Sequence, residues 1–352
     1  MKRTFLTLLV MLMAVGFVSA QTLTTNDAVL VYYMPKTLLA FDVEYTQTTR
    51  TQGPFYQYAE RYLGTKDIVM TNETVFELKR ITIDTETLAD KSRAFKFHPV
   101  YSQKANIVLN SKGMIESYNA EVQAEKKTSP FKDNRDKKRS EGKTVSKKST
   151  IAPLSEEALF ASSKAKMAEA AAKQIYRIRE TRMNLLSGEV EHMPADSRML
   201  EKMLEELDKQ EEELVALFVG TTKIQSHNER ILRAPTEDEK GVVILRFSKF
   251  SGVVGADDMS GEPIMVSIKT TKKQLAEPED KKEKAKPFSE IYYNIPGEAT
   301  VKVSDSKGRL LVGKTLPIAQ FGVSIPLPMD LIKRKPHILF DTNTGAIQSI
   351  SE

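Results

Sequence analysis

The hydrophobic period of this chain changes twice, and this change limits its possible folds more than any other feature. Apolar residues alternate with polar ones up to residue 118, recur every three or four residues between 155 and 220, and alternate again after Thr222. Alternation is typical of half-buried β-strands, and the longer period is typical of amphipathic helices. The sequence therefore predicts a mainly β protein that carries an α-helical hairpin.

The first β-rich part is predicted to form an N-terminal β-sandwich domain over residues 21–120. Leu39, Phe41 and Val43 alternate with polar or small neighbours, as expected of a strand with one buried face. Further strand patterns cover residues 74–84, 93–97 and 107–119, the last of them a hairpin that turns at Gly113.

The middle part, residues 151–220, is predicted to form a long antiparallel helix pair. Ser155 and Asp196 are suited to cap the two helices, and Gly188 and Gly220 are suited to end them. Apolar residues share one face of each predicted helix, among them Ile175, Ile178, Leu207, Leu214 and Phe218. At about 1.5 Å per residue, each helix is long enough to extend well beyond one domain.

The second β-rich part, residues 221–352, repeats two motifs of the first part in the same order. VYYMPKTLLAFDV (31–43) is similar to IYYNIPGEATVKV (291–303), and IVLNSKGMIESY (107–118) is similar to ILFDTNTGAIQSI (338–350). We therefore expect an internal duplication, with two related β-sandwich-like domains linked by the helix pair. A chance likeness of strand and turn patterns is the alternative.

The N-terminus has the pattern of a secretory signal peptide over residues 1–20. Lys2 and Arg3 precede an apolar run, and small residues precede the expected cleavage site before Gln21. The apolar run is shorter than the about 20 residues that a spanning helix needs, so a transmembrane anchor is the weaker alternative. Cysteine is absent from the whole chain, which excludes disulfides and cysteine-ligated metal sites.

Two segments are rich in charge and poor in apolar residues. Residues 121–150 are predicted to form a basic disordered loop, with ten Lys/Arg and four Asp/Glu between Glu125 and Lys148. A charged, proline-flanked stretch at 271–287 is predicted to be a flexible loop. In an exported protein the basic loop points to an anionic lipid surface rather than to nucleic acid, and a solvated linker is the simpler interpretation.

GPFYQYAERYLG, residues 53–64, concentrates aromatic rings in a chain that is otherwise poor in them. Proline suits the first turn of a helix, and Phe55, Tyr58 and Tyr62 then share one face. We expect an amphipathic helix that packs this face on a β-sheet and ends at the final glycine. The residues outside that face, which are candidate partner contacts, are Tyr56, Gln57 and Arg61.

GPFYQYAERYLG, together with YYMP, NLLSGE, LFVGTT, AQFG and DTNTGAIQSI, makes the chain resemble a secreted or periplasmic family of unknown function in Bacteroidota. The resemblance covers nearly the whole chain after residue 20, and GPFYQYAERYLG is its most specific part. It implies a location in the periplasm or at the outer membrane of a Gram-negative bacterium. It implies no activity, cofactor or catalytic residue.

Residues suited to chemistry are scattered along the sequence. The histidines lack a second histidine at metal-ligand spacing, so we predict neither a metal site nor a cofactor; they are His98, His192, His227 and His337. Carboxylates expected in loops make a hydrolase the third hypothesis, and they are Asp84, Glu86, Asp90, Asp257 and Asp258. The sequence contains no nucleophile elbow and no phosphate-binding loop.

The helix pair carries methionines near its expected tip, and methionine suits adaptable interfaces, although packing within the hairpin is the simpler interpretation. We predict a non-enzymatic interaction or scaffold protein of the cell envelope that binds a protein partner. Its candidate contacts are Tyr56, Gln57, Arg61, Met193 and Met199. A glycan-binding module that uses Tyr32 and Tyr56 is the alternative, because exposed tyrosines stack on sugar rings.

Overall fold

The computed structural model describes residues 21–23, 29–97, 106–120, 154–156, 160–161, 163–189, 196–272 and 290–351. The described chain is mainly β, with antiparallel sheets and four α-helices, as the sequence predicts. The predicted signal peptide, the basic loop, all but the first two residues of the 271–287 loop, and Met193 lie outside the described residues.

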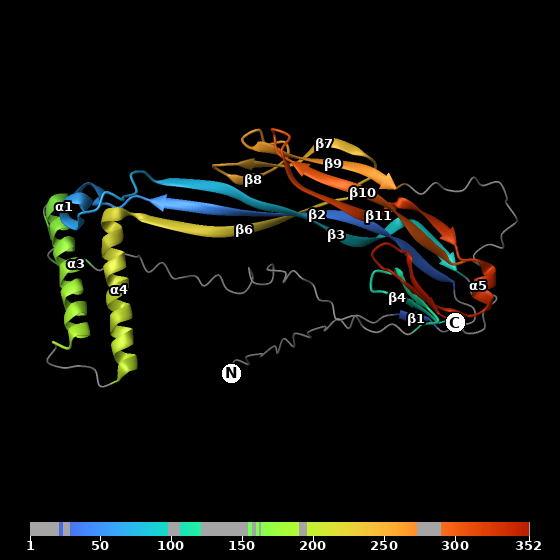
Figure 1. Ribbon diagram of the computed structural model, residues 1–352, viewed down its shortest axis with the longest axis horizontal. Helices are drawn as coiled ribbons and strands as arrows, with labels where there is room; N and C mark the ends of the chain where they lie inside the picture. The colour runs from blue at the N-terminus through green and yellow to red at the C-terminus, as the bar shows by residue number, and fades with distance from the viewer. Residues whose placement is uncertain are drawn as a thin grey trace, which may run out of the picture.

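The longest strands form a sheet with the order β3-β2-β6. These strands are β2 (Leu30–Thr51), β3 (Glu73–Phe97) and β6 (Thr221–Arg233). At about 3.3 Å per residue, the 22 residues of β2 extend for about 70 Å, so this sheet determines the long axis of the molecule (Figure 1). Both neighbours run antiparallel to β2.

Strand β3 is continuous where the sequence predicts two strands. The pairing jumps from Tyr33 opposite Ala94 to Met34 opposite Asp90, which is a bulge in β3. In the bulge, Arg93 donates to the carboxylate of Asp90 at 3.0 Å and to the carbonyl oxygen of Pro35 at 2.6 Å. A bulge keeps a strand paired while it bends, so the polar residues there do not end β3.

A second sheet, with the order β11-β10-β9-β7-β8, packs on one face of the first. Its strands are β7 (Glu239–Ser248), β8 (Gly252–Val254), β9 (Glu262–Lys272), β10 (Tyr292–Ser304) and β11 (Leu310–Pro326). Fully buried residues from both sheets, such as Phe41, Val266, Val301 and Ile318, form the main core. Facing sheets with interdigitating side chains make this part a β-sandwich.

A third sheet closes the end of the molecule where β2 begins, with the order β1-β4-β5-β12-β13. Its strands are β1 (Gln21–Leu23), β4 (Ile107–Leu109), β5 (Ile115–Tyr118), β12 (His337–Phe340) and β13 (Ile347–Ser351), and the short helix α5 (Met329–Lys333) precedes β12. This sheet and the start of β2 enclose a second core that includes Tyr32, Tyr118, Ile291 and Ile338.

We call the three sheets the body, except for the end of the first sheet that extends beyond the main core toward the helix pair. The body combines strands from both sides of the helix pair. Strand β5 pairs with β12, and β2 pairs with β6. The expected division into an N-terminal sandwich over 21–120 and a C-terminal sandwich over 221–352 therefore differs from the strand pairing, which interlocks the two parts. Alternation predicts which residues of a strand face inward, but it does not specify which strands become neighbours.

The two repeated motifs nevertheless occupy equivalent places in the body. Strands β2 and β10 each begin at a tyrosine pair and each pair with the long strand that follows them. The backbone N–H of Tyr33 donates to the oxygen of Gly113 at 3.0 Å, and that of Asn294 donates to the oxygen of Gly345 at 2.8 Å. Each glycine lies in the turn of one repeated hairpin, so the two motifs contact each other in the same way in both parts.

Helices α3 (Lys164–Ser187) and α4 (Ser197–Val219) form an arm at the far end of the long sheet, opposite the third sheet (Figure 1). Asp196 caps α4 as predicted, whereas α3 begins after Ser163 rather than after Ser155. Gly188 ends α3 with a φ of 77°, in the left-handed region that favours glycine. None of the described helices combines the length and the apolar character that a membrane span requires.

Candidate interaction surface on the helical arm

The root of the arm is where the segment 52–72 closes the C-terminal end of α4. The last carbonyl groups of a helix have no partner within the helix. Here the backbone N–H of Phe55 donates to Leu217 O at 2.8 Å, and that of Val69 donates to Val219 O at 2.8 Å. A Cβ atom on Gly53 would lie 2.4 Å from Leu217 O, so this approach requires glycine at position 53.

The GPFYQYAERYLG motif forms a short 3₁₀ turn, Tyr56–Tyr58, followed by helix α1, Ala59–Leu63. The helix ends at Gly64, with a φ of 68°, as predicted. Phe55 is buried in a core with α3 and α4, and Tyr58 and Tyr62 pack against the same core, so the aromatic face packs inward. The expectation that it packs on a sheet is wrong, because at this end the helix pair supplies the apolar surface.

The predicted polar rim of this motif lies at the root of the arm. Tyr56 is half-buried, whereas Gln57 and Arg61 are exposed. The side-chain amide of Gln57 donates to the hydroxyl of Tyr56 at 3.1 Å. The guanidinium of Arg61 lies 5.4 Å from the centre of the Tyr62 ring, within the range of a cation–π contact. Tyr56 and Gln57 thus contact each other, and all three side chains are at least partly accessible.

Ion pairs connect α3 and α4 along their middle turns. Arg179 contacts Glu211 at 2.6 Å, and Arg182 contacts Glu211 at 2.7 Å and also Asp208. Hydrogen bonding to Asp208, opposed by partial desolvation, raises the pKa of the Arg182 guanidinium above its ordinary value. These pairs reflect a wider charge division, because α3 carries six Lys/Arg and two Asp/Glu whereas α4 carries three and seven. The helices therefore have net charges of +4 and −4.

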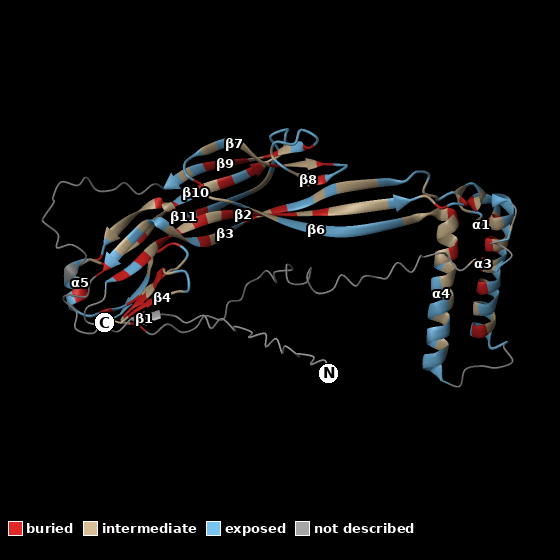
Figure 2. Cartoon of the chain, turned by 180° about the vertical axis from the view of Figure 1, so that it is seen from behind, coloured by how far each residue is buried: buried red, intermediate tan, exposed pale blue. Residues whose placement is uncertain are grey.

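Beyond the ion pairs the arm exposes several apolar residues, although Leu185 of α3 is still buried there. Leu186 comes eleven residues, about three turns, after buried Ile175 and lies on the same face, yet it is 68% exposed. Met203 stands in the same relation to buried Leu214 and is 42% exposed. We call the exposed apolar residues of this half the distal patch: Met183, Leu186, Met199 and Met203. Figure 2 shows that α3 keeps buried residues almost to its distal end, whereas the distal half of α4 has none.

The predicted contacts fall into two groups rather than one site. Tyr56, Gln57 and Arg61 lie at the root, beside the C-terminal end of α4. Met199 is 60% exposed and lies in the first turn of α4, about 30 Å away along the helix. Leu186 was missed by sequence reasoning, because its spacing matches the buried face of α3 and only the fold shows that it is exposed among the described residues.

Tyr32, the other tyrosine of the glycan-binding alternative, is unable to contact a glycan. Its side chain is completely buried in the body, where its hydroxyl donates to the carbonyl oxygen of Tyr292 at 3.2 Å and accepts from the backbone N–H of Tyr292 at 2.6 Å. Burial raises the pKa of Tyr32 above its ordinary value. Its ring stacks on Phe95 at 5.9 Å, so Tyr32 is part of the core.

The carboxylates of the hydrolase hypothesis are engaged in structural contacts. Asp84, Glu86 and Asp90 lie within β3, not after a strand end as expected. Glu86 contacts Arg230 at 2.7 Å, and the carboxylate of Asp90 accepts from Arg93 and Ser92. Across the described residues, no group of three or more acidic or histidine side chains is placed to hold a metal ion.

The other histidines and loop carboxylates show no catalytic arrangement in the described chain. The ring of His227 stacks on Tyr45 at 5.1 Å, and Asp258 accepts from the backbone N–H of Ser260 at 2.9 Å. His337 is exposed at the start of β12. His98 and His192 lie outside the described residues.

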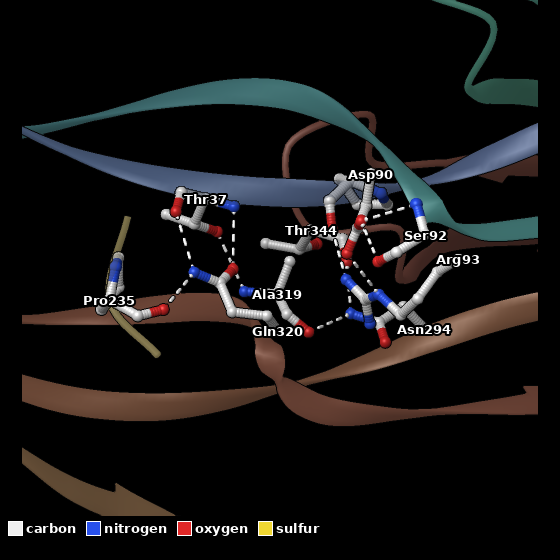
Figure 3. Close-up of polar contacts among 10 residues, drawn as sticks. Thr37, Asp90, Ser92, Arg93, Pro235, Asn294, Ala319, Gln320 and Thr344 are labelled. Carbon is white, nitrogen blue, oxygen red and sulfur yellow. Dashed lines mark hydrogen bonds and ion pairs between the residues drawn. The ribbon is translucent and has the colours of Figure 1, made fainter. Parts of the chain in front are cut away.

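A buried polar junction connects β2, β10 and β11 in the body (Figure 3). The amide of Gln320 accepts from the backbone N–H of Thr37 and donates to the carbonyl oxygens of Thr37 and Pro235, each at 2.9 Å. The amide of Asn294, which is completely buried, donates to Ala319 O at 2.9 Å and to the backbone oxygen of Thr344 at 2.8 Å. These bonds join the repeated strands to each other, so we interpret the junction as structural.

Comparison with known proteins gives one result beyond the fold. A family model described as a domain of unknown function, DUF4831, matches residues 29–348. The matched span includes the body and the arm. No curated protein and no solved structure matches the chain.

Proposed function

The chain belongs to this family, the DUF4831 domain of unknown function, and we propose that it is a non-enzymatic interaction or scaffold protein of the bacterial cell envelope. The observation that carries the proposal is the distal patch of the arm. Four apolar side chains with exposures between 42% and 70% lie on two helices that stand clear of the body. Exposed apolar side chains on a projecting element are a common feature of interaction sites.

The architecture supports a structural role for the body and a binding role for the arm. The body buries its own apolar faces in two cores. The second sheet still contacts β3 at Phe76, opposite Gln47 of β2, and beyond this point β2, β3 and β6 continue toward the arm (Figure 1). A helix pair with exposed apolar residues that projects away from the body is suited to contact a partner protein.

We also propose export to the periplasm or to the periplasmic face of the outer membrane. The signal-peptide pattern of residues 1–20 supports this location. Internal duplication belongs to the same proposal. The equivalent contacts of the two tyrosine-pair strands with Gly113 and Gly345 support an origin of both parts from one unit.

Site-specific photo-cross-linking in growing cells tests the interaction role. A photoreactive residue at position 199 samples the distal patch, and one at position 201, two residues later, points to the opposite side of α4 at nearly the same height. We expect a cross-linked species from position 199 and none from position 201. Equal yields at both positions, or none at either, would contradict the proposal.

A charge-matched pair of variants separates binding from folding. Met199→Asp with Met203→Asp lowers the net charge by two, and so does Lys202→Gln with Lys209→Gln on the polar side of the same helix. We expect only the methionine variant to lose partner recovery from envelopes, with both variants keeping the thermal midpoint of the unchanged protein. If the lysine variant loses recovery equally, the apolar patch is not the contact.

A further inference from the structure

We infer that the outer edge of strand β6 binds a basic, extended segment of a partner protein as an additional strand of the first sheet. This inference rests on the proposed interaction role and assigns it a second contact surface. Two observations carry it: the unpaired backbone groups along β6, and the position of the acidic helix α4 beside them.

The pairing of the first sheet shows which residues of β6 point to its outer side. In an antiparallel sheet the N–H and C=O groups of one residue point to the same side, and successive residues alternate. The N–H of Phe76 donates to Lys249 O at 2.7 Å, so the groups of Phe76 point away from β2. Gln47, opposite Phe76, therefore points toward β6, where its partner is Gln225.

The outward residues of β6 are those that alternate with Gln225. Because the pairing of β6 with β2 has no register shift, they include Thr222, Ile224, Ser226 and Asn228. Strand β6 is an edge strand, and within the described chain no hydrogen bond joins the backbone of these four residues to a segment other than β2. Unpaired backbone groups along a regular edge are a template for another strand.

Other edge positions of the same sheet are protected. On the outer side of β3, the ammonium of Lys314 donates to Ile83 O at 3.3 Å. Past the end of β6, the amide of Gln320 bonds to both the N–H and the carbonyl oxygen of Thr37, each at 2.9 Å. The pairing of β3 with β2 also has two register shifts. Such caps and bulges prevent a further strand from adding, so β6 differs in lacking them.

The outer edge of β6 faces a corner that is bounded by the arm. In both views β6 is the strand on the side toward which the arm extends, and α4 lies between α3 and the body (Figures 1 and 2). Helix α4 has a net charge of −4, whereas residues 222–228 of β6 include one Lys and no Asp or Glu. The acidic helix beside this edge therefore favours a basic occupant.

The direction of the arm argues against a second copy as the occupant. Two copies of β6 would pair antiparallel about a two-fold axis perpendicular to the sheet. This axis would turn the arm of each copy toward the sheet of the other (Figure 1). A single extended segment meets no such obstacle. Since residues 222–226 of β6 are exposed, both faces of the added strand would be open to solvent, and we expect polar side chains on both.

Proline substitution tests the backbone contacts directly, because proline has no N–H and is tolerated on the open side of an edge strand. Ser226→Pro removes one outward N–H from β6. Thr74→Pro is the matched control: Thr74 lies opposite Thr49, so its N–H points outward from β3, at the opposite edge of the same sheet. Both variants should keep the thermal midpoint of the unchanged protein.

Photo-cross-linking of the full chain in growing cells is the measurement. Ile224 is 69% exposed and its backbone points outward, so a photoreactive residue at position 224 lies next to the added strand. We expect an adduct whose yield falls at least tenfold with Ser226→Pro and is unchanged with Thr74→Pro. Mass spectrometry of the adduct should identify a basic segment of another protein.

Three results would overturn the inference: no adduct from position 224, equal yields with both proline variants, or an adduct with an acidic segment or with this chain itself.

Amide hydrogen exchange of the purified, unchanged protein provides a second test that does not depend on the proline variants. The outward amides of Ile224 and Ser226 should exchange as fast as open amides. A synthetic peptide that copies the cross-linked segment should slow them at least tenfold. Slow exchange before the peptide is added would mean that the chain covers its own edge, and unchanged exchange after it is added would mean that the segment does not pair with β6.

These outcomes remain distinct from failure of the proposed function. If position 199 yields an adduct and position 224 does not, the interaction role stands and strand addition is wrong. If only position 224 yields an adduct, strand addition stands and the distal patch is not the contact. If neither position yields one, both are wrong.

Discussion

The body and the arm use the same chain to bury apolar surface in two different ways. In the body, every buried stripe faces another sheet, and residues such as Phe41, Val301 and Ile338 are completely excluded from solvent. In the arm, Leu185 is buried beyond the ion pairs, whereas Leu186 and Met203 repeat the spacing of buried residues without being buried. The arm thus exposes a larger share of its apolar residues than the body does.

The end of the β3-β2-β6 sheet that extends from the body to the arm, which we call the ribbon, keeps the helix pair apart from the body. The last buried residue of β2 is Tyr45, and residues 46–51 are half-buried or exposed, with polar side chains on both faces. A two-sided polar sheet gains little from a second layer, so it extends without attracting one. The ribbon must therefore derive its stability from the body end, where it joins the main core.

The largest expected effect tests that anchoring. The carboxylate of Asp42, whose side chain is 3% exposed, accepts from Arg230 at 2.7 and 2.9 Å and joins β2 to β6. Arg230→Met leaves this carboxylate buried without its guanidinium, and we expect a loss of about 3–5 kcal/mol in the free energy of unfolding. Urea denaturation followed by circular dichroism measures this loss.

A second ion pair on the same three-stranded sheet is the control for this change. Arg80 contacts Glu44 at 2.7 Å, but its side chain is 63% exposed, and such pairs contribute about 1 kcal/mol or less. Arg80→Met should therefore change stability little. Equal effects of the two substitutions would show that burial at Asp42 does not anchor β6 to the body.

The next effect compares the two halves of the arm within one helix. Leu214 is completely buried and Met203 is 42% exposed, although eleven residues place them on the same face of α4. We expect Leu214→Ala to lower the free energy of unfolding by about 2–5 kcal/mol and Met203→Ala to lower it by less than about 0.5 kcal/mol in the isolated chain. Thermal or urea unfolding at low protein concentration measures both.

A large effect of Met203→Ala under these conditions would mean that the distal half is closed in solution. If the loss grows with protein concentration, the exposed methionine contributes through association rather than through folding. The same pair of variants therefore distinguishes a complete arm from an open one.

Much of the local structure could be predicted from the sequence. The alternation at Leu39, Phe41 and Val43 places these residues in the main core, and Asp196 caps α4. The spacing of Phe55, Tyr58 and Tyr62 indicates a packed aromatic face. These features depend on short-range periodicity and capping, which act within a few residues.

What could not be predicted depends on contacts between distant segments. The polar stretch around Asp90 resembles a loop, but Arg93 fills a bulge there and keeps β3 continuous. The sequence makes Tyr32 a candidate for an exposed aromatic residue, but its hydroxyl is hydrogen-bonded to the backbone of Tyr292 in the core. Leu186 has the spacing of a core residue yet is 68% exposed beside buried Leu185, a difference that spacing alone does not predict. The contacts of Arg93 with Pro35 and of Tyr32 with Tyr292 join residues that are far apart in the sequence.

The smallest expected effect on stability at neutral pH is that of Tyr45, the last buried residue of β2. Tyr45 is 8% exposed, packs against Phe76 and Phe247, and donates its hydroxyl hydrogen to Glu229 at 2.7 Å. Burial, aided by the negative charge of Glu229, raises its pKa to about 12, whereas an unfolded tyrosine titrates near 10. Between these values the folded state holds a proton that the unfolded state has released, so stability must fall as the pH rises.

The contribution of Tyr45 is therefore fully present below about pH 10 and is lost as the pH rises through about 12. Tyr45→Phe keeps the ring and removes the titration. The difference in urea midpoint between the two proteins should be constant up to about pH 10 and should then shift in favour of the variant. Parallel profiles from about pH 9 to 12 would mean that Tyr45 is solvated, and the boundary between the closed body and the open ribbon would then lie nearer the core.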